Sequence, residues 1–414
     1  MAKALVGQPE MLKEINRAHV LDILLEARVI SRPELAKRTG LSRATIAILT
    51  DELLDLGIVR ARGLGDSGGG RPPVILEFNP DAALAMGASL RNHHWDLVLT
   101  SLDGRVVRRS TVPVQDLTPD SAIAALHTGV KQITADTRSQ VNMARLLPAI
   151  GVGTPGLVDM HAGIVKTAVD VGWFDVPVQA MAETVLGIPV YVANRSKVGA
   201  LAELWSGRTR NVQNLIYVSI GTGIAAGIVL QGQLYTGANS SAGELGHVTV
   251  VPDGPLCGCG NRGCLQALAS GPAIANRARE RLRSTGDSLL LALVDGHPER
   301  ITAETVFMAA ELGDRLAMDV VANTATVLGI AFANLINLFN PELIILGGPV
   351  GQGSQILLEP LRAEVQRRAM AYPLSVVQIE ASTLGNDADA IGAAVLVLQQ
   401  ASEILFTQDT ANLI

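Results

Sequence analysis

The chain has 414 residues, of which 48% are hydrophobic and 17% charged, and it contains 41 glycines and three cysteines. This composition is typical of a globular α/β protein with two or three domains, and the odd number of cysteines argues against a disulfide framework. The net charge is −6, but the first eighty residues hold 11 Lys and Arg against 10 Asp and Glu. The N-terminus lacks the apolar core of a signal peptide, and no apolar stretch approaches the roughly 18 residues that span a bilayer. We therefore expect a cytoplasmic protein without a membrane partner.

Residues 1–80 predict three helices followed by a β-hairpin. Ser31 and Ser42 are N-cap candidates for the second and third helices, which Gly40 and Gly57 would end. Glu34, three residues after Ser31, completes a capping-box pattern. The apolar stripe of the first helix consists of Leu12, Ile15, Val20, Ile23 and Leu24. Two short helices joined by a tight turn are typical of a helix-turn-helix.

The segment after the third helix resembles the wing of a winged helix-turn-helix. Ile58–Arg62 and Pro73–Phe78 predict two strands, and the Gly-rich tip between them carries Arg71. An arginine on such a tip can enter a narrow minor groove. The predicted DNA contacts are Arg32, Ser42, Arg43, Ala44, Thr45 and Arg71.

Other interpretations of these patterns remain open. Helix-turn-helix patterns also occur as packing units or protein-binding modules, and Gly-rich tips occur as linkers. If the domain binds DNA, one copy covers one half-site. A homodimer or homotetramer on a palindromic double-stranded DNA operator is then expected.

From residue 84 the chain reads as α/β. Leu84–Ser89, His94–Leu102 and Val106–Val114 predict a strand meander with a turn at Asp103 and Gly104. Residues 215–220, 226–230 and 233–236 repeat this design, which indicates the duplicated, two-lobed actin-like or sugar-kinase fold (ribonuclease H-like). The apolar helix Val320–Phe339 is expected either at an interface or in an ordinary core.

All three cysteines lie in one short window, and a histidine precedes them. One imidazole and three thiolates with intervening glycines match the ligand set of a closed, structural zinc site, so we expect bound Zn²⁺. The alternative is a chance cluster of buried or redox-active thiols. The candidate ligands are His247, Cys257, Cys259 and Cys264.

Several motifs in this order resemble the ROK family (repressor, open reading frame, kinase). They are Gly151-Val-Gly-Thr-Pro-Gly156, Gly221-Thr-Gly223, Gly243-Glu-Leu-Gly-His247, the Cys257–Cys264 window and Leu338–Gly348. A winged domain in front is similar to the repressor branch. The resemblance implies a winged helix-turn-helix at 1–80, a first lobe at 81–195, and a second lobe at 196–414 with the zinc loop and a pocket shared between the lobes.

The resemblance also shows where the kinase machinery has been lost. Family kinases need a Gly-rich first phosphate turn, and this chain has Leu90-Arg-Asn-His-His94 there, without glycine or carboxylate. Arg195 stands where the catalytic aspartate is expected, and a guanidinium cannot accept a proton. The second phosphate loop, Gly221-Thr222-Gly223, survives. These departures predict no catalysis.

By the same resemblance, the degenerate cleft binds an effector. A glutamine also stands where the family has glutamate, which makes the pocket more positive. The effector is then an anionic sugar derivative paired with Arg195, or else Arg195 ion-pairs with Glu244 or another carboxylate. The implied effector-binding residues are Gly153, Asn194, Arg195, Glu244, His247 and Gln266.

The sequence thus predicts a DNA-binding repressor of sugar uptake or catabolism genes controlled by a sugar-derived effector. The alternative is a ROK sugar kinase with an accessory DNA-binding domain. We expect an inducer that weakens DNA binding, although the sequence does not fix that sign, and control by a partner protein also stays open.

Overall fold

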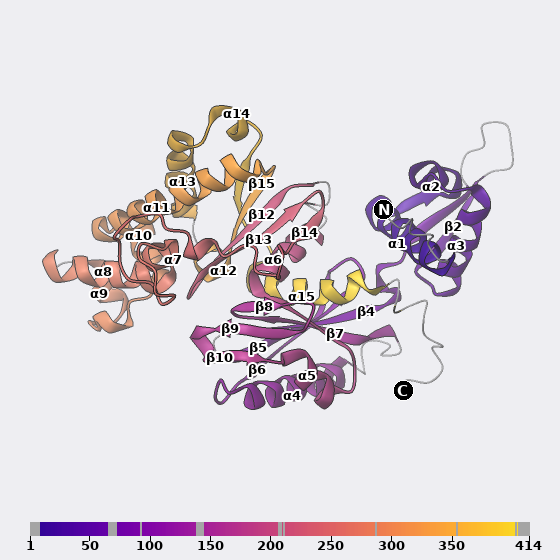
Figure 1. Cartoon of the computed structure of the whole chain (residues 1–414), viewed down its shortest axis with the longest axis horizontal. Helices are drawn as coiled ribbons and strands as arrows, with labels where there is room; N and C mark the ends of the chain where they lie inside the picture. The colour runs from indigo at the N-terminus through magenta and orange to yellow at the C-terminus, as the bar shows by residue number, and fades with distance from the viewer. Residues whose placement is uncertain are drawn as a thin grey trace, which may run out of the picture.

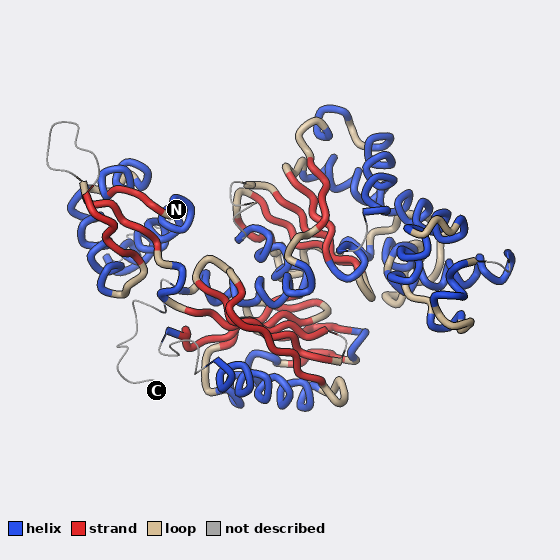
Figure 2. Tube along the Cα trace, turned by 180° about the vertical axis from the view of Figure 1, so that it is seen from behind, coloured by secondary structure: helices blue, strands red, loops and turns tan. Residues whose placement is uncertain are grey.

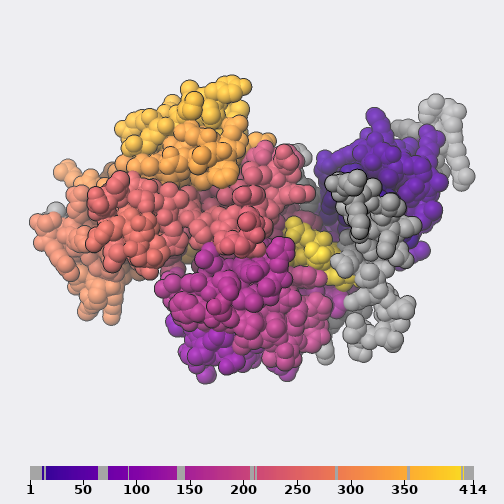
Figure 3. Space-filling model, in the orientation of Figure 1, coloured from indigo at the N-terminus to yellow at the C-terminus, as the bar shows by residue number. Residues whose placement is uncertain are grey.

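The structure is a computed structural model that describes residues 9–64, 73–91, 93–137, 145–205, 209, 212–285, 288–352, 355–401 and 404. An N-terminal winged domain stands to one side of two α/β lobes (Figure 1). The space-filling view shows the same separation, with the winged domain projecting from one end of the molecule (Figure 3). The predicted fold class is confirmed.

The winged domain has three helices and a three-stranded sheet. The hydroxyl of Ser31 accepts a hydrogen bond from the Glu34 amide at 3.3 Å, and that of Ser42 accepts one from the Thr45 amide at 3.1 Å. Both predicted N-caps therefore form, each satisfying a free amide of the first helical turn. The elements are α1 (Pro9–Ala27), β1 (Val29–Ser31), α2 (Arg32–Thr39), α3 (Arg43–Asp55), β2 (Val59–Leu64) and β3 (Val74–Phe78), with sheet order β1-β3-β2.

Helix α1 buries less of its predicted apolar stripe than expected. Val20 and Leu24 are fully buried, but Leu12 and Ile15 are 53% and 58% exposed. The 3.6-residue period therefore identified the helix correctly and overestimated how much of its apolar stripe is buried.

The first lobe is built on a five-stranded sheet of order β11-β7-β4-β5-β6. Antiparallel β4, β5 and β6 form the predicted meander, and β7 and β11 extend it in parallel. A small sheet of order β10-β9-β8 lies beside it. The strands are β4 (Leu84–Arg91), β5 (His94–Ser101), β6 (Val106–Pro113), β7 (Leu146–Thr154), β8 (Leu157–Asp159), β9 (Ile164–Ala168), β10 (Trp173–Val176) and β11 (Val190–Asn194).

The second lobe repeats this topology, with sheet order β14-β13-β12-β15-β16. Again three antiparallel strands form a meander, and two parallel strands are added beside its first strand. Figure 2 shows both large sheets. The strands are β12 (Leu215–Ile220), β13 (Ile224–Leu230), β14 (Gln233–Tyr235), β15 (Leu343–Gly347) and β16 (Gln378–Ala381).

Two helices join the lobes. α6 packs against the second sheet through β12 and β13, and α15 packs on the first sheet through β4 and β7; the two helices also pack against each other. The chain thus returns to its first lobe at its C-terminal end (Figure 1). The remaining helices are α4 (Pro119–Thr137), α5 (Val178–Leu186), α7 (Leu265–Ala269), α8 (Gly271–Thr285), α9 (Leu289–Leu293), α10 (Ala303–Glu311), α12 (Gly348–Gln352), α13 (Gln355–Arg368) and α14 (Ala371–Leu374), with α6 at Arg195–Trp205 and α15 at Ala388–Gln399.

Helix α11 (Arg315–Phe339) corrects the expectation that no apolar stretch is long enough to span a bilayer. An 18-residue window within it has a mean hydropathy of 1.6, enough by length and composition to cross a membrane. In the fold, 61% of that window is buried, and Val320, Leu328 and Phe332 belong to the core of the second lobe. The ordinary-core interpretation therefore accounts for most of this helix, while Leu338 at its end is 77% exposed.

Candidate functional site

The N-terminus of α3 presents the side chains expected to contact DNA. Ser42, Arg43 and Ala44 are exposed, whereas Thr45 is partly buried and its hydroxyl lies 2.8 Å from that of Ser42. Arg32 forms an ion pair with Asp51 of α3, so part of its charge is used inside the domain. Arg71 lies outside the described residues.

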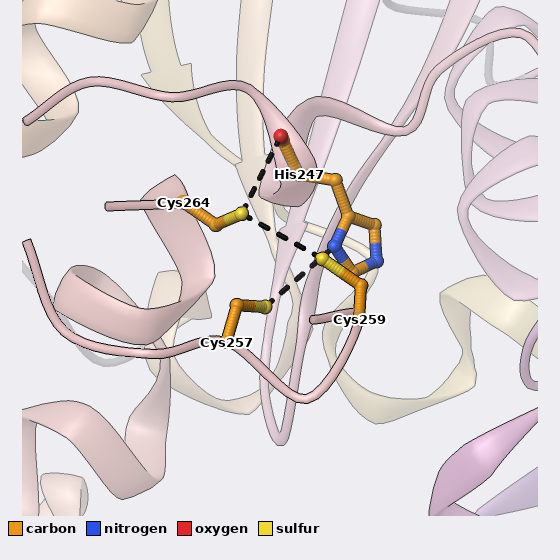
Figure 4. A group of neighbouring side chains, drawn as sticks. All are labelled: His247, Cys257, Cys259 and Cys264. Carbon is orange, nitrogen blue, oxygen red and sulfur yellow. Dashed lines mark hydrogen bonds between the residues drawn. The ribbon is translucent and has the colours of Figure 1, made fainter. Parts of the chain in front are cut away.

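The four candidate metal ligands lie together in the second lobe. Their ligand atoms are all within 4.8 Å of one another, and the side chains point toward a common centre (Figure 4). Cys259 Sγ lies 3.8 Å from Cys264 Sγ, and Cys257 Sγ lies 3.8 Å from His247 Nδ1. A tetrahedral site with Zn–S bonds of about 2.3 Å has edges of about 3.8 Å. The cluster therefore fits a metal ion.

The loop that carries the cysteines is shaped by its own backbone. The Cys257 amide donates to the Asn261 carbonyl at 2.8 Å. Gly263 has φ +69°, and a Cβ there would lie 1.6 Å from the Val251 carbonyl oxygen, so only glycine fits. A hydrogen bond from the Asn261 backbone lowers the pKa of Cys259 to about 7. Burial together with the neighbouring thiols raises the pKa of Cys264 to about 11, because adjacent thiolates repel without a cation.

A cleft of about 840 Å³ lies between the lobes next to this cluster. Five of the six residues that the sequence assigned to the effector line it: Asn194, Arg195, Glu244, His247 and Gln266. Gly153 does not. It lies within β7, where a Cβ would be 3.1 Å from the Val198 side chain, and Gly156 takes its place on the cleft wall.

His247 belongs to both sites. Its Nδ1 faces the sulfur atoms, so Nε2 is the ring nitrogen available to a ligand in the cleft. Gln266 also links them: its Nε2 lies 3.6 Å from Cys257 Sγ, and it lines the cleft.

Asn194 is fixed where β11 meets α6. Its Nδ2 donates to the Gly156 carbonyl at 2.5 Å, and its Oδ1 accepts from the Ser196 amide at 2.8 Å. The following Arg195 opens α6 and reaches across to the Leu90 carbonyl, with Nη1 at 3.5 Å. The beginning of α6 is therefore part of the cleft.

The sequence missed a buried carboxylate in this cleft. Asp389, in the first turn of α15, is 8% exposed. Burial raises its pKa, while the charges of Arg195 and Arg91 oppose that shift. Arg91, in the segment that the sequence compared with the family's first phosphate turn, pairs with Asp96 at 2.9 Å. The charge of Arg195 therefore acts on Asp389, a carboxylate that the sequence did not single out; the Asn386–Asp389 run at a helix start was the available signal.

Lys197 is the second missed residue. It is 2% exposed, and burial lowers its pKa while the charge of Glu244 opposes the shift. Burial in turn raises the pKa of Glu244, and Lys197 and His247 oppose that. A buried lysine behind the cleft therefore compensates the charge of Glu244.

The loop Gly221-Thr222-Gly223 closes the other side of the cleft. The Gly221 amide donates to the Gly223 carbonyl at 2.9 Å, and the Gly271 amide at the start of α8 donates to the Gly221 carbonyl at 2.8 Å. Thr222 donates to Asp170 of the first lobe at 3.3 Å. The lobes therefore meet across the cleft at this loop.

Comparison with known proteins gives consistent relatives. A xylose repressor of Caldicellulosiruptor bescii is 31% identical over 393 residues, which are 95% of this chain and 98% of that protein. The crystal structure of a ROK family transcriptional regulator, a homologue of the E. coli MLC protein, is 30% identical with a TM-score of 0.82, covering 96% of this chain and 98% of that one.

A kinase is similar over a smaller share of the chain. The structure of a ROK family glucokinase from Streptomyces griseus, in complex with glucose and AMPPNP, is 30% identical with a TM-score of 0.69. It covers 76% of this chain and 99% of the glucokinase. The ROK family model itself matches residues 86–400. Because that match covers both lobes and the repressor relatives extend over the winged domain as well, the chain belongs to the ROK family.

Proposed function

We propose that this protein is a DNA-binding transcriptional repressor of genes for sugar uptake or catabolism, controlled by a sugar-derived effector in the cleft. The observation that carries the proposal is that one chain combines an N-capped α3, whose first residues are exposed, with a cleft between two ROK lobes. In that cleft Arg195 stands where the family resemblance expects the catalytic aspartate. Repressor relatives that span almost the whole chain support it. We divide the chain into a winged domain at 1–80 and lobes at 81–195 and 196–414.

The experiment is an operator-binding titration with a panel of sugars. The full-length protein is titrated onto its own promoter DNA at stated salt, alone and with D-xylose, D-glucose, their phosphates and their sugar acids. A sugar-controlled repressor loses several-fold to about 100-fold of its operator affinity with at least one compound. A protein that does not bind its promoter, or binds it equally with every compound, is not this repressor.

The charge of the cleft decides which compounds to compare. Arg91 and Arg195 both line it, and Asp389 opposes them from α15. Arg279, Asp170, Glu244 and Glu304 also line the cleft, so its overall charge does not by itself select an anion. The anionic proposal rests on Arg195, which forms no ion pair among the described residues and which an anionic effector would supply with a partner. Calorimetry distinguishes the options: tight binding of a neutral sugar that survives Arg195→Ala would instead assign Arg195 to Asp389.

Arg43 tests the DNA surface. We expect Arg43→Ala to weaken operator binding by about 1–3 kcal/mol if it contacts a base, or to lower the salt slope by about one unit if it contacts a phosphate. Fluorescence anisotropy across a salt series measures both. Arg283→Ala, at an exposed arginine of the second lobe, is the matched control. Equal losses of operator affinity in the two variants would show that α3 does not contact the DNA.

A single winged domain reads one half-site, so we propose a homodimer or homotetramer on a palindromic operator. The bound metal in this proposal is Zn²⁺ in a structural role, held by one imidazole and three thiolates. It would shape the loop that presents Gln266 and orient His247 toward the cleft. The protein acts in the cytoplasm, at the nucleoid.

We also propose that the protein is not a sugar kinase. The base position is occupied by Arg195, and Arg91 stands in the first phosphate turn, paired with Asp96. A coupled assay with ATP and the sugar panel is expected to give no sugar-dependent ADP, with a ROK glucokinase as positive control. ATP-dependent phosphorylation of any sugar would favour the alternative of a kinase with an accessory DNA-binding domain.

A further inference from the structure

Helix α6 connects the effector cleft to the other end of the first lobe. Arg195 opens it inside the cleft, and Trp205 ends it ten residues later, which at about 1.5 Å per residue is about 15 Å away. Every residue from Ser196 to Glu203 is buried. A helix packed on all sides cannot bend independently of its neighbours, so a shift at one end reaches the other.

Trp205 is in direct contact with the turn between β5 and β6. Its indole Nε1 donates to the Leu102 carbonyl at 3.2 Å. Gly104 in the same turn has φ +83°, and a Cβ there would lie 2.9 Å from Trp205 Cδ1. The close approach of turn and indole therefore requires glycine at this position.

The same turn holds the winged domain. Asp103 Oδ2 pairs with Arg28 Nη2 at 3.1 Å, and the Leu102 amide donates to the Pro80 carbonyl at 2.9 Å. Pro80 belongs to the segment that links the winged domain to β4. The turn therefore contacts α6 on one side and two points of the winged domain on the other.

Arg28 is rigidly placed within the winged domain. It follows α1 directly, and its φ of 61° is unfavourable for a residue with a side chain. Its guanidinium lies 5.4 Å from the ring centroid of Phe78, the last residue of β3, and its carbonyl accepts the Phe78 amide at 2.8 Å. A displacement of Arg28 would therefore move α1 and strand β3 together.

We propose that the turn Leu102–Arg105 is the joint through which α6 transmits effector binding to the winged domain, by the Trp205–Leu102 hydrogen bond and the Asp103–Arg28 ion pair. This inference rests on the proposed function. Its residues are positioning residues, because Arg28, Asp103 and Trp205 do not line the cleft. Trp205 is at the end of α6 that is far from the cleft, and the turn with Asp103 lies next to it. Breaking the joint should leave both binding sites intact and weaken only the communication between them.

The test is the ratio of operator dissociation constants with and without the sugar that releases the wild-type protein. In the full-length Asp103→Asn variant we expect this ratio to fall at least about fivefold, within the range that a coupling of this kind spans. Sugar affinity by calorimetry and the thermal unfolding midpoint should match the wild type. Trp205→Phe keeps an aromatic ring and removes the hydrogen bond, and should lower the ratio in the same way.

Glu359→Gln, which removes an exposed ion pair with Arg362 in the second lobe, is the control and should leave the ratio unchanged. Hydrogen exchange gives a second measurement, since the Leu102 amide should change its exchange rate when sugar binds. A wild-type ratio in both Asp103→Asn and Trp205→Phe overturns the joint while leaving the repressor proposal intact. A wild-type protein that ignores every sugar of the panel overturns sugar control, and the joint with it.

Discussion

Gly392→Ala is expected to destabilise the two lobes by about 3–5 kcal/mol, a large fraction of an ordinary domain's stability. Gly392 lies in α15 where that helix crosses α6, and a Cβ there would be 1.6 Å from the Val198 carbonyl oxygen. Within a helix, alanine is favoured over glycine by about 1 kcal/mol, which acts in the opposite direction. The clash wins because it meets backbone, which cannot rotate away as a side chain can.

Urea unfolding followed by tryptophan fluorescence measures this effect. Trp95 and Trp173 are buried in the first lobe and report its unfolding. Gly258→Ala is the matched control, since a Cβ there meets nothing within 4 Å and its φ is not in the left-handed region. If Gly392→Ala unfolds at the wild-type urea concentration, α15 and α6 do not approach as closely as described.

Cys257→Ser is expected to release the metal and with it the repression of the target genes. Loss of an outer-shell partner costs about 10–100-fold in metal affinity, and removing a thiolate ligand should cost more. The winged domain should remain folded, because its core residues belong to a cluster shared with the first lobe and α15 that contains no residue of the cysteine loop. Zinc content by elemental analysis and a reporter gene under the operator measure the two effects.

Leu256→Ser provides the control for this variant. Leu256 precedes Cys257 in the same loop and is 65% exposed, so its replacement introduces the same serine without removing a ligand. Zinc content and repression should both stay at wild-type levels. Full repression by a zinc-free Cys257→Ser protein would show that the metal does not support the effector site.

Local patterns were enough to predict much of the fold. Ser31 and Ser42 act through atoms only three residues away, and the β5–β6 hairpin of the first meander follows from the turn at Asp103 and Gly104. The metal site could be predicted from the sequence for the same reason, since three of its four candidate ligands lie within eight residues. In each of these cases the interacting groups are neighbours in the sequence.

The missed features depend on residues far apart in the sequence. Asp389 meets Arg195 only because α15 returns to the first lobe, and nothing near Arg195 indicates it. The ion pair of Arg32 with Asp51 was not predicted either, because the two residues are brought together only by the packing of α2 against α3. Gly153 fell on the wrong side of a strand-to-loop boundary, where a shift of three residues separates the interior of a sheet from a cleft wall.

The position of α15 has a consequence for biosynthesis. The winged domain leaves the ribosome first, while the helix that covers the first sheet emerges after more than three hundred further residues have been added. During that interval β4 and β7 lack the layer that packs directly on their backbone at Gly87 and Gly151. A nascent chain can therefore contain the complete winged domain long before the two lobes are complete. A chain whose synthesis stops in between would carry the winged domain without the completed cleft that is proposed to bind the effector.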